Sequence, residues 1–475
     1  MLGQAGRLQH RVGQAPERGI PGDGGSKSLI TSARNLWETL LEISESSPDD
    51  AVSKRITGLV PRRLGEVVRK RLRDEPVVAL QGPRTVGKST LLRSVASANR
   101  VEVFDLDDLA TRAAVAADPA LFVAGPEPVC IDEYQKAPAV LDAIKAELNV
   151  DLRPGRFLIT GSTRYDALPA AAQALTGRLH IVTIYPLSQG EIARTHENLV
   201  AMLFDDPDRV VARAAPSETT RLQYIERVTA GGFPVALVRS DTTRGRWFDD
   251  YVALTLERDV PELANIRRRG QLPRLLQRLA GQTAQVLNVS KAATESRMDD
   301  DTAETYLRLL EAVFLLQRLP AWGTTLRARA AAKPKIHAVD SGVAARLLRL
   351  TPAKLARLDP TSLTQFGHLL ETFAVCEAIK QVTWLDGIAG CGHWRTHDGD
   401  EADLVIERED GSIVALEVKS ASRVTGDDLK GLRKLREATG AAFIAGVVLY
   451  LGERSYSYDD RLHAMPVDRL WMEIG

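Results

Sequence analysis

The sequence predicts an α/β protein whose first folded part is a parallel β-sheet covered by helices on both faces. Short apolar runs alternate with segments of helical length between residues 76 and 184. Parallel strands need a crossover connection, and a helix usually supplies it. Helical periodicity dominates from about residue 191 to 350, and alternating strand patterns return after it. The five strands predicted for the first sheet are residues 76–80, 101–104, 129–131, 157–160 and 180–184.

Length and composition predict several domains. The chain has 475 residues, of which 44% are hydrophobic and 26% charged, as in globular proteins. Lysine plus arginine (62) balances aspartate plus glutamate (62), so the overall charge does not indicate nucleic-acid binding. Residues 1–27 lack apolar periodicity and are predicted to be disordered. We divide the chain into a weakly ordered extension (1–52), the sheet domain (53–200), a helical region (201–350) and a smaller α/β domain (351–475).

Cysteine usage and hydropathy indicate the cellular compartment of the protein. The three cysteines, Cys130, Cys376 and Cys391, form no C-x-x-C pair, so neither a disulfide framework nor a cysteine zinc site is indicated. The longest apolar run, residues 441–451, is too short to cross a bilayer, and the start of the chain lacks an apolar signal core. We expect a cytoplasmic protein without a membrane partner.

A phosphate-binding loop follows the first predicted strand. The sequence Gly82-Pro-Arg-Thr-Val-Gly87-Lys88-Ser89 has the pattern G-x-x-x-x-G-K-[ST]. Glycines let the backbone approach a phosphate closely, and the helix that follows directs the positive end of its dipole at the anion. Lys88 is expected to reach the β- and γ-phosphates, and the Ser89 hydroxyl to ligate Mg²⁺. We therefore predict that ATP and Mg²⁺ are bound by Gly82, Pro83, Arg84, Thr85, Val86, Gly87, Lys88, Ser89 and Thr90.

Acidic and hydroxyl side chains end two neighbouring predicted strands. Asp132 is expected to hold Mg²⁺, usually through water, and Glu133 to polarise the attacking water as general base. Ser162 follows the next strand and is a candidate to touch the γ-phosphate or to position the water. An ordinary turn residue is the alternative for Ser162. Together with Lys88, these residues predict a hydrolytic site.

These elements resemble one group of AAA-type ATPases, whose prokaryotic members carry a C-terminal domain of unknown function with a nuclease-like fold. Further motifs that carry the resemblance are Ala174-Leu-Thr-Gly-Arg178, Ile184-Tyr-Pro-Leu187, Gly231-Gly-Phe-Pro234, Leu256-Glu-Arg258-Asp259 and Val339-Asp340-Ser-Gly342. The resemblance covers about residues 59–475. It implies a P-loop ATPase core, a helical lid, a winged-helix-like middle and a C-terminal α/β domain similar to restriction endonucleases.

The same resemblance suggests arginines for the ATPase site. Arg178 is a candidate γ-phosphate sensor, and Arg258 is a second one, in the lid or from a neighbouring subunit. Both have a surface salt bridge as the alternative. A homo-oligomer is compatible with such an arrangement. Val235 departs from the family, which often has a glutamate at this position, so a lid role for that carboxylate is not expected.

Residues 272–319 resemble the winged-helix module of these proteins, with residues 299–310 as its recognition helix. A helix that enters a DNA groove usually carries basic or amide side chains on its leading turn. This one begins with Asp299, Asp300 and Asp301, which suit a helix N-terminus and would repel phosphates. We favour a packing role, although Arg297 and Arg308 keep DNA recognition open.

The C-terminal domain carries a pattern typical of Asp…Glu-x-Lys nucleases. Asp403 lies in one predicted strand, and Glu417 and Lys419 share a face at the end of the next. Two such carboxylates can bind Mg²⁺, while the lysine orients water and stabilises charge on a phosphate. Glu371, in a helix predicted over residues 369–380, matches a further acid of such folds. A strand without metal chemistry is the alternative.

A zinc site in the same domain is less favoured. Cys391, His393 and His397 lack a fourth ligand at a suitable spacing, so we interpret them as surface loop residues. The sequence leaves three functions open. The first is an ATPase whose nucleotide state controls the nuclease-like domain, with DNA as a candidate substrate. The second is an ATP-dependent switch whose C-terminal domain only binds DNA or a protein. The third is structure-specific DNA cleavage regulated by ATP.

Overall fold

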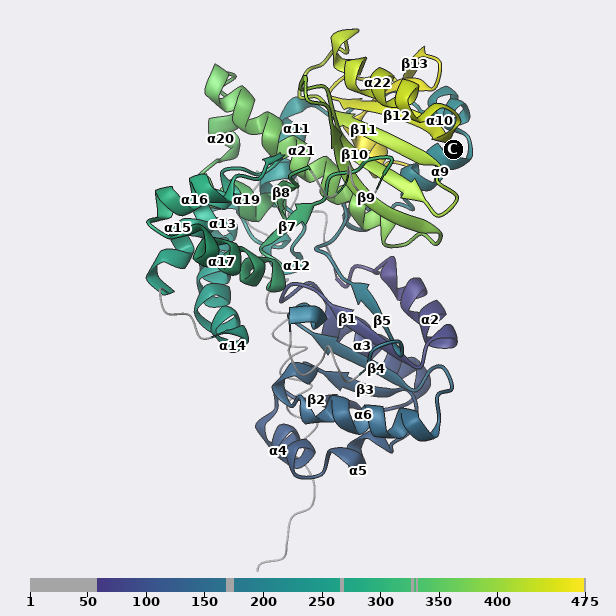
Figure 1. The fold of residues 1–475 in the computed structure, drawn as a ribbon, viewed down its shortest axis with the longest axis vertical. Helices are drawn as coiled ribbons and strands as arrows, with labels where there is room; N and C mark the ends of the chain where they lie inside the picture. Colours follow the sequence, from purple (N-terminus) through teal and green to yellow (C-terminus); the bar gives the residue numbers. More distant parts are fainter. Residues whose placement is uncertain (1–57, 168–174, 265–268, 326–328, 330–331, 474–475) are drawn as a thin grey trace, which may run out of the picture. The chain divides into compact units, whose positions relative to one another are not determined.

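The computed structural model describes residues 58–167, 175–264, 269–325, 329 and 332–473 (Figure 1). The predicted tail, residues 1–27, and the rest of the extension to residue 52 lie outside this part. Among the described helices, none is both long and apolar enough to cross a membrane.

The predicted parallel sheet is confirmed. Its order is β2-β3-β4-β1-β5, and all four pairings are parallel (Figure 1). Every residue of β1, β3 and β4 is buried, because helices cover both faces, and this explains their nearly continuous apolar sequences. The strands are β1 (Val77–Gln81), β2 (Val103–Asp105), β3 (Val129–Asp132), β4 (Phe157–Gly161) and β5 (Leu179–Thr183). The helices of this part are α2 (Leu64–Asp74), α3 (Lys88–Asn99), α4 (Leu109–Ala117), α5 (Pro119–Val123) and α6 (Ala139–Val150).

The first described helix, α2, covers only part of a segment whose apolar residues recur at helical spacing from Leu59 to Leu72. The periodicity begins at Leu59, but α2 begins at Leu64, and Leu59 is 77% exposed. Pro61 explains the difference, since a proline disfavours helical backbone in the residue before it.

The helical region continues from β5. It contains α8 (Gln189–Ala193), α9 (Leu199–Asp205), α10 (Pro207–Arg213), α11 (Arg221–Ala230), α12 (Pro234–Leu237) and α13 (Asp241–Leu254). A single π-helical turn, η5 (Thr255–Asp259), then leads into α14 (Val260–Leu263). Such turns are rare and occur frequently at functional sites.

Three helices and a small antiparallel sheet lie between residues 272 and 338. The helices are α15 (Leu272–Ala280), α16 (Val289–Ser296) and α17 (Asp300–Ala312), and the sheet has the order β6-β8-β7. Its strands are β6 (Gln285–Val286), β7 (Leu316–Leu319) and β8 (Lys335–Ala338), followed by α19 (Ser341–Leu347) and α20 (Pro352–Leu355). Asp299 caps α17 by accepting from the backbone N–H of Thr302 at 2.8 Å, while Leu307 and Leu310 are buried. This capping and burial support the packing role expected for the helix.

The C-terminal domain has a six-stranded mixed sheet in the order β13-β14-β12-β11-β10-β9. The strands are β9 (Ile388–Arg395), β10 (Glu401–Arg408), β11 (Ile413–Val418), β12 (Phe443–Tyr450), β13 (Tyr456–Asp459) and β14 (Leu462–Pro466). Its helices are α21 (Pro360–Val382), which extends the predicted helix at both ends, and α22 (Lys430–Thr439). Most of α21 from Phe366 onward is buried, so this helix is a core element of the domain.

Candidate nucleotide site

The loop from Gly82 to Gly87 connects β1 to α3, as the motif predicts. A Cβ atom at Gly82 would lie 2.1 Å from the carbonyl oxygen of Ile184, and Gly87 has a positive φ of 100°. Both positions therefore need glycine. Gly87 also offers no side chain to cap α3, which leaves the first N–H groups of the helix for an anion.

Arg62 contacts the C-terminal part of this loop. Its guanidinium donates to the carbonyl oxygens of Val86 at 2.6 Å and Tyr185 at 2.7 Å, and it pairs with Glu191 at 3.0 Å. Sequence reasoning did not single out Arg62, because a basic residue beside an amphipathic helix usually belongs to a solvated face. The contacts give it a positioning role for the loop.

The Lys88 side chain is buried inside the loop. Its Nζ donates to the carbonyl oxygens of Gly82 at 3.0 Å and Pro83 at 2.8 Å. Burial lowers the pKa of Lys88 to about 8, and the charges of Glu133 and Asp132 oppose this shift. A bound polyphosphate would add negative charge beside the ammonium group, so the lysine is suited to hold one.

The two residues predicted to hold magnesium are brought together. The carboxylate of Asp132, at the end of β3, accepts a hydrogen bond from the hydroxyl of Thr160, and the Ser89 hydroxyl is near enough to lower the pKa of Asp132. Burial raises the pKa of Asp132, and the Thr160 and Ser89 hydroxyls oppose the rise. A hydroxyl and a carboxylate are oxygen ligands of the kind that Mg²⁺ prefers, so the residues fit the ion. Thr160, one strand away, was not predicted as part of the site.

Glu133 and Ser162 are connected through a residue that the sequence did not indicate. The side-chain amide of Gln135 donates to Glu133 and, at 3.1 Å, to Ser162 Oγ. The backbone N–H of Glu133 also donates to Thr160 Oγ1 at 3.2 Å, and Glu133 has a positive φ of 56°. The carboxylate is therefore fixed at the end of the sheet where the loop lies, as a general base requires.

Arg84 connects the loop to the helical region. Its Nε donates to both carboxylate oxygens of Asp259 at 2.8 Å, and a second guanidinium nitrogen lies 2.7 Å from Oδ1. Asp259 is the last residue of the π-helical turn η5 and is buried, whereas its neighbour Arg258 is exposed. In this chain the residue of the Leu-Glu-Arg-Asp motif that contacts the loop is thus Asp259. A second ion pair joins Lys136 to Glu262 at 3.1 Å. Lys136 is close in sequence to Glu133, and Glu262 is close in sequence to Asp259.

Arg178 is far from the loop of its own chain. It immediately precedes β5, whose first residue Leu179 pairs with Val77 at the start of β1, while the loop follows the end of β1. Four strand residues separate the two ends, roughly 13 Å. Arg178 instead donates to Asn149 Oδ1 at 2.7 Å. Sensing of γ-phosphate by Arg178 within one subunit is therefore not supported, and a role in a neighbouring subunit stays a prediction.

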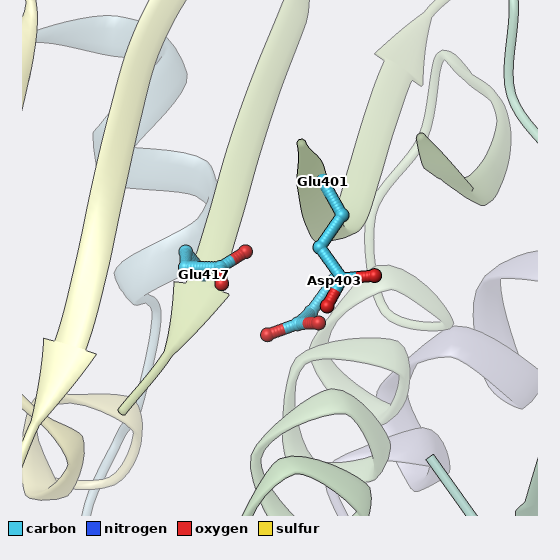
Figure 2. A group of neighbouring side chains, drawn as sticks. All are labelled: Glu401, Asp403 and Glu417. Carbon is cyan, nitrogen blue, oxygen red and sulfur yellow. The ribbon is translucent and has the colours of Figure 1, made fainter. Parts of the chain in front are cut away.

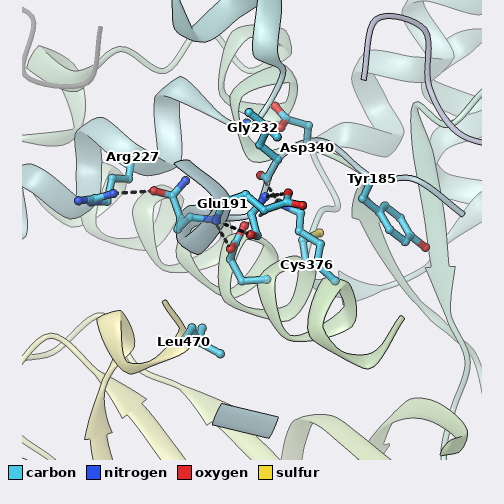
Figure 3. Close-up of polar contacts among 12 residues, drawn as sticks. Tyr185, Glu191, Arg227, Gly232, Asp340, Cys376 and Leu470 are labelled. Carbon is cyan, nitrogen blue, oxygen red and sulfur yellow. Dashed lines mark hydrogen bonds and ion pairs between the residues drawn. The ribbon is translucent and has the colours of Figure 1, made fainter. Parts of the chain in front are cut away.

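Two of the family-like motifs pack against each other (Figure 3). The carboxylate of Asp340 accepts from the backbone N–H groups of Gly232 at 2.7 Å and Gly342 at 2.9 Å. A Cβ at Gly231 would lie 2.2 Å from Asp340 Oδ1. Burial raises the pKa of Asp340, opposed chiefly by the Gly232 hydrogen bond. These motifs therefore join α11 to α19 rather than contribute to the nucleotide site.

A second buried group of contacts, drawn in the same figure, reaches the C-terminal domain (Figure 3). In α21, Lys380 pairs with Glu377 at 2.6 Å and donates to the carbonyl oxygen of Leu187 at 3.0 Å. Glu377 also accepts from the backbone N–H of Gln189 at 2.7 Å, and the Gln189 side chain accepts from Arg227 at 2.7 Å. The segment after β5 is thereby tied to both α11 and α21.

Two of the predicted C-terminal carboxylates, Asp403 and Glu417, lie on adjacent strands, and Glu401, which was not predicted, lies beside them (Figure 2). Asp403 and Glu401 extend from β10 and Glu417 from β11, and each offers an oxygen within 4.8 Å of the others. Lys419 Nζ lies 2.7 Å from Glu417 Oε1, as expected for side chains on one strand face. Glu371, in α21, is connected to Asp403 through Lys335 of β8, which lies 2.7 Å from both carboxylates. Lys335 was not predicted.

The interpretation of Cys391 and His393 as surface loop residues is wrong. Both belong to β9, and His393 is buried with its Nε2 3.0 Å from the carbonyl oxygen of Lys333. His397 is exposed, as predicted. In the described part of the chain, the one group of metal-ligand side chains that are close enough together is Glu401, Asp403 and Glu417, so the geometry gives no support to zinc.

The parallel sheet, the loop between β1 and α3 and the acidic pair at the end of β3 define a P-loop nucleotide-binding domain. Residues 74–193 match the family model described as AAA domain, which supports an AAA-type P-loop ATPase. Residues 221–354 and 366–470 match two domains of unknown function, DUF8612 and DUF4143.

Relatives do not add an established activity. The uncharacterized proteins Mb2031c of Mycobacterium bovis and Rv2008c of Mycobacterium tuberculosis are each 27% identical over 407 residues, which cover 85% of this chain and 82% of theirs. Among solved structures, the Thermotoga maritima RuvB Holliday junction branch migration motor is 17% identical, with coverage of 54% of this chain and 89% of that one. Its TM-score of 0.24 is too low to support any conclusion about this chain.

Proposed function

We propose that this chain is a Mg²⁺-dependent ATPase of the AAA type. The observation that carries the proposal is the convergence of Lys88, the neighbouring oxygens of Ser89 and Asp132, and the oriented carboxylate of Glu133 at one end of the sheet. Lys88 binds the phosphates, and Glu133 accepts the proton of the attacking water. Ser89 and Asp132 would hold Mg²⁺, which when bound neutralises phosphate charge. Ser162, bridged to Glu133 by Gln135, positions the water.

Replacing Lys88 by methionine tests the phosphate contact. Loss of a charged hydrogen-bond donor costs about 1.5–3 kcal/mol, equivalent to about 10- to 150-fold in affinity for ATP. Equilibrium binding of a fluorescent ATP analogue in the presence of Mg²⁺ measures it. Lys145→Met, at an exposed position of α6, is the matched control and should bind as the wild type does. Equal affinity in Lys88→Met and Lys145→Met would exclude the proposed site.

In this proposal, Arg84 couples the binding of nucleotide to the conformation of the helical region. The guanidinium belongs to the phosphate loop, and the buried Asp259 holds it in a bidentate pair. Phosphate oxygens are alternative partners for the same planar donors. ATP would therefore draw Arg84 away from Asp259 and release η5 and α14. Arg178 would complete the site of a neighbouring subunit in a homo-oligomer.

Hydrogen exchange can detect this release. In the wild type, ATP should speed backbone exchange in η5 and α14, because the Arg84–Asp259 pair no longer holds the turn. Arg84→Gln should exchange at the faster rate with or without ATP. Arg93→Gln, which removes an exposed pair with Asp105, should behave as the wild type. The coupling would be refuted if ATP bound without altering exchange in these two elements.

For the C-terminal domain, we favour a binding role, with DNA or a protein as the partner, over metal-dependent cleavage. Lys335 lies among the carboxylates that a nuclease would use for Mg²⁺, and this observation supports the preference. The competing function predicts Mg²⁺-dependent nicking of plasmid or branched DNA that Asp403→Ala and Lys419→Ala each abolish. Nicking with that dependence would overturn the binding role.

A further inference from the structure

The ammonium group of Lys335 lies between carboxylates from two other elements. Its Nζ is 2.7 Å from Asp403 Oδ1 on β10 and 2.7 Å from Glu371 Oε1 on α21, with Glu401 Oε2 at 3.8 Å. The Lys335 and Asp403 side chains are each only 2% exposed. A lysine is almost never buried this deeply unless it is paired, so the acidic group and the lysine depend on each other.

The carboxylates around Lys335 favour its protonated, positively charged form. Burial alone would lower its pKa, but the charges of Asp403 and Glu371 outweigh that effect and raise it, so Lys335 stays protonated. Burial would raise the pKa of Asp403, yet Lys335 holds it below the ordinary value. Burial and the charge of Asp403 raise the pKa of Glu371 well above its usual range. The ammonium therefore stabilises Asp403 as the charged member of the group.

Four of the oxygens that a divalent ion could use already accept hydrogen bonds, namely both oxygens of Asp403, Oε1 of Glu371 and Oε1 of Glu417. Asp403 Oδ2 accepts from the backbone N–H of Val418 at 2.9 Å, and Glu417 Oε1 is held by Lys419. Glu417 Oε2 and Glu401 Oε2 are buried and have no hydrogen-bond partner among the described residues, although Lys335 lies 3.8 Å from the latter. The acidic group therefore has more buried acceptor oxygens than Lys335 and Lys419 satisfy.

We propose that Lys335 is the resident cation of this carboxylate group and takes the place of a divalent metal ion. With the ammonium present, Asp403 and Glu371 are occupied and the group does not take up Mg²⁺ or Mn²⁺. Removal of the ammonium leaves Glu371, Asp403, Glu401 and Glu417 as an unfilled oxygen site for a divalent cation. The proposal is independent of the ATPase activity, because it concerns other residues.

Mn²⁺ binding by the full chain without nucleotide tests the proposal, with free Mn²⁺ quantified by electron paramagnetic resonance. Lys335→Ala should bind about one more equivalent of Mn²⁺ than the wild type, and Lys335→Ala/Asp403→Asn should lose it. Mn²⁺ should also raise the Tm of Lys335→Ala by more than it raises that of the wild type. If folded Lys335→Ala binds no additional ion, the proposal fails.

The wild type provides a test that does not depend on the folding of Lys335→Ala. Asp403→Asn and the wild type should bind Mn²⁺ equally, since Lys335 excludes the ion from this group in the native chain. Lys354→Ala, at a lysine on α20 outside the group, is the matched control and should gain no ion. Loss of Mn²⁺ binding in Asp403→Asn would show that the native group already holds a metal ion and would overturn the proposal.

Discussion

The Glu133→Gln variant is expected to bind ATP and to hydrolyse it about 10²- to 10⁴-fold more slowly than the wild type, the range typical for loss of a general base. A glutamine keeps the size of the side chain and an oxygen that can accept from Gln135, so the loop and its binding groups stay in place. It cannot accept a proton from water. Binding and hydrolysis should therefore separate in this variant.

Phosphate release at saturating ATP and Mg²⁺ measures the hydrolysis, and a fluorescent ATP analogue measures the binding. Asp142→Asn, an exposed acid on α6, is the control and should match the wild type in both. A Glu133→Gln variant that still turned over within threefold of the wild type would assign the base to another residue.

Lys380→Met should be among the most destabilising single substitutions in the chain, with a loss of about 3–5 kcal/mol in the free energy of unfolding. The substitution leaves the buried carboxylate of Glu377 without its partner at 2.6 Å and the Leu187 carbonyl oxygen without its donor. Uncompensated buried charge is the physical reason, since methionine fills nearly the same volume. The contacts between the segment after β5 and α21 should weaken with it.

Urea denaturation measures the loss. The double variant Lys380→Met/Glu377→Gln should recover part of it, because a neutral glutamine can still accept from the Gln189 N–H. Lys145→Met, an exposed replacement, should stay within about 0.5 kcal/mol of the wild type. If Lys380→Met lost less than about 1 kcal/mol, the pair would not have the structural role given to it.

The nucleotide site could be predicted largely from the sequence because its signals are local. The loop is one contiguous segment, and Asp132 and Ser162 each follow a short apolar run that a parallel sheet brings to the same edge. Arg62, Gln135 and Asp259 could not be predicted, since their roles depend on tertiary contacts. In the sequence Arg62 and Gln135 resemble ordinary surface residues, and the motif that contains Asp259 directed the prediction to Arg258 instead.

The C-terminal group shows the same limit. The period-two alternation of a strand places Glu417 beside Lys419, and the structure confirms that pairing. Lys335, by contrast, stands 68 positions before Asp403 in another sheet, so no spacing in the sequence relates them. The strand β9 was also missed, because its glycines at 390 and 392 interrupt the apolar pattern, and this led to the wrong interpretation of His393.

Steady-state release of inorganic phosphate from ATP, measured on the wild-type chain with and without Mg²⁺, tests the ATPase proposal most directly. We predict turnover that requires Mg²⁺ and that falls to the background level in both Lys88→Met and Glu133→Gln. ATP binding by the wild type without Mg²⁺-dependent release above the level of Glu133→Gln would contradict hydrolysis and leave nucleotide binding alone.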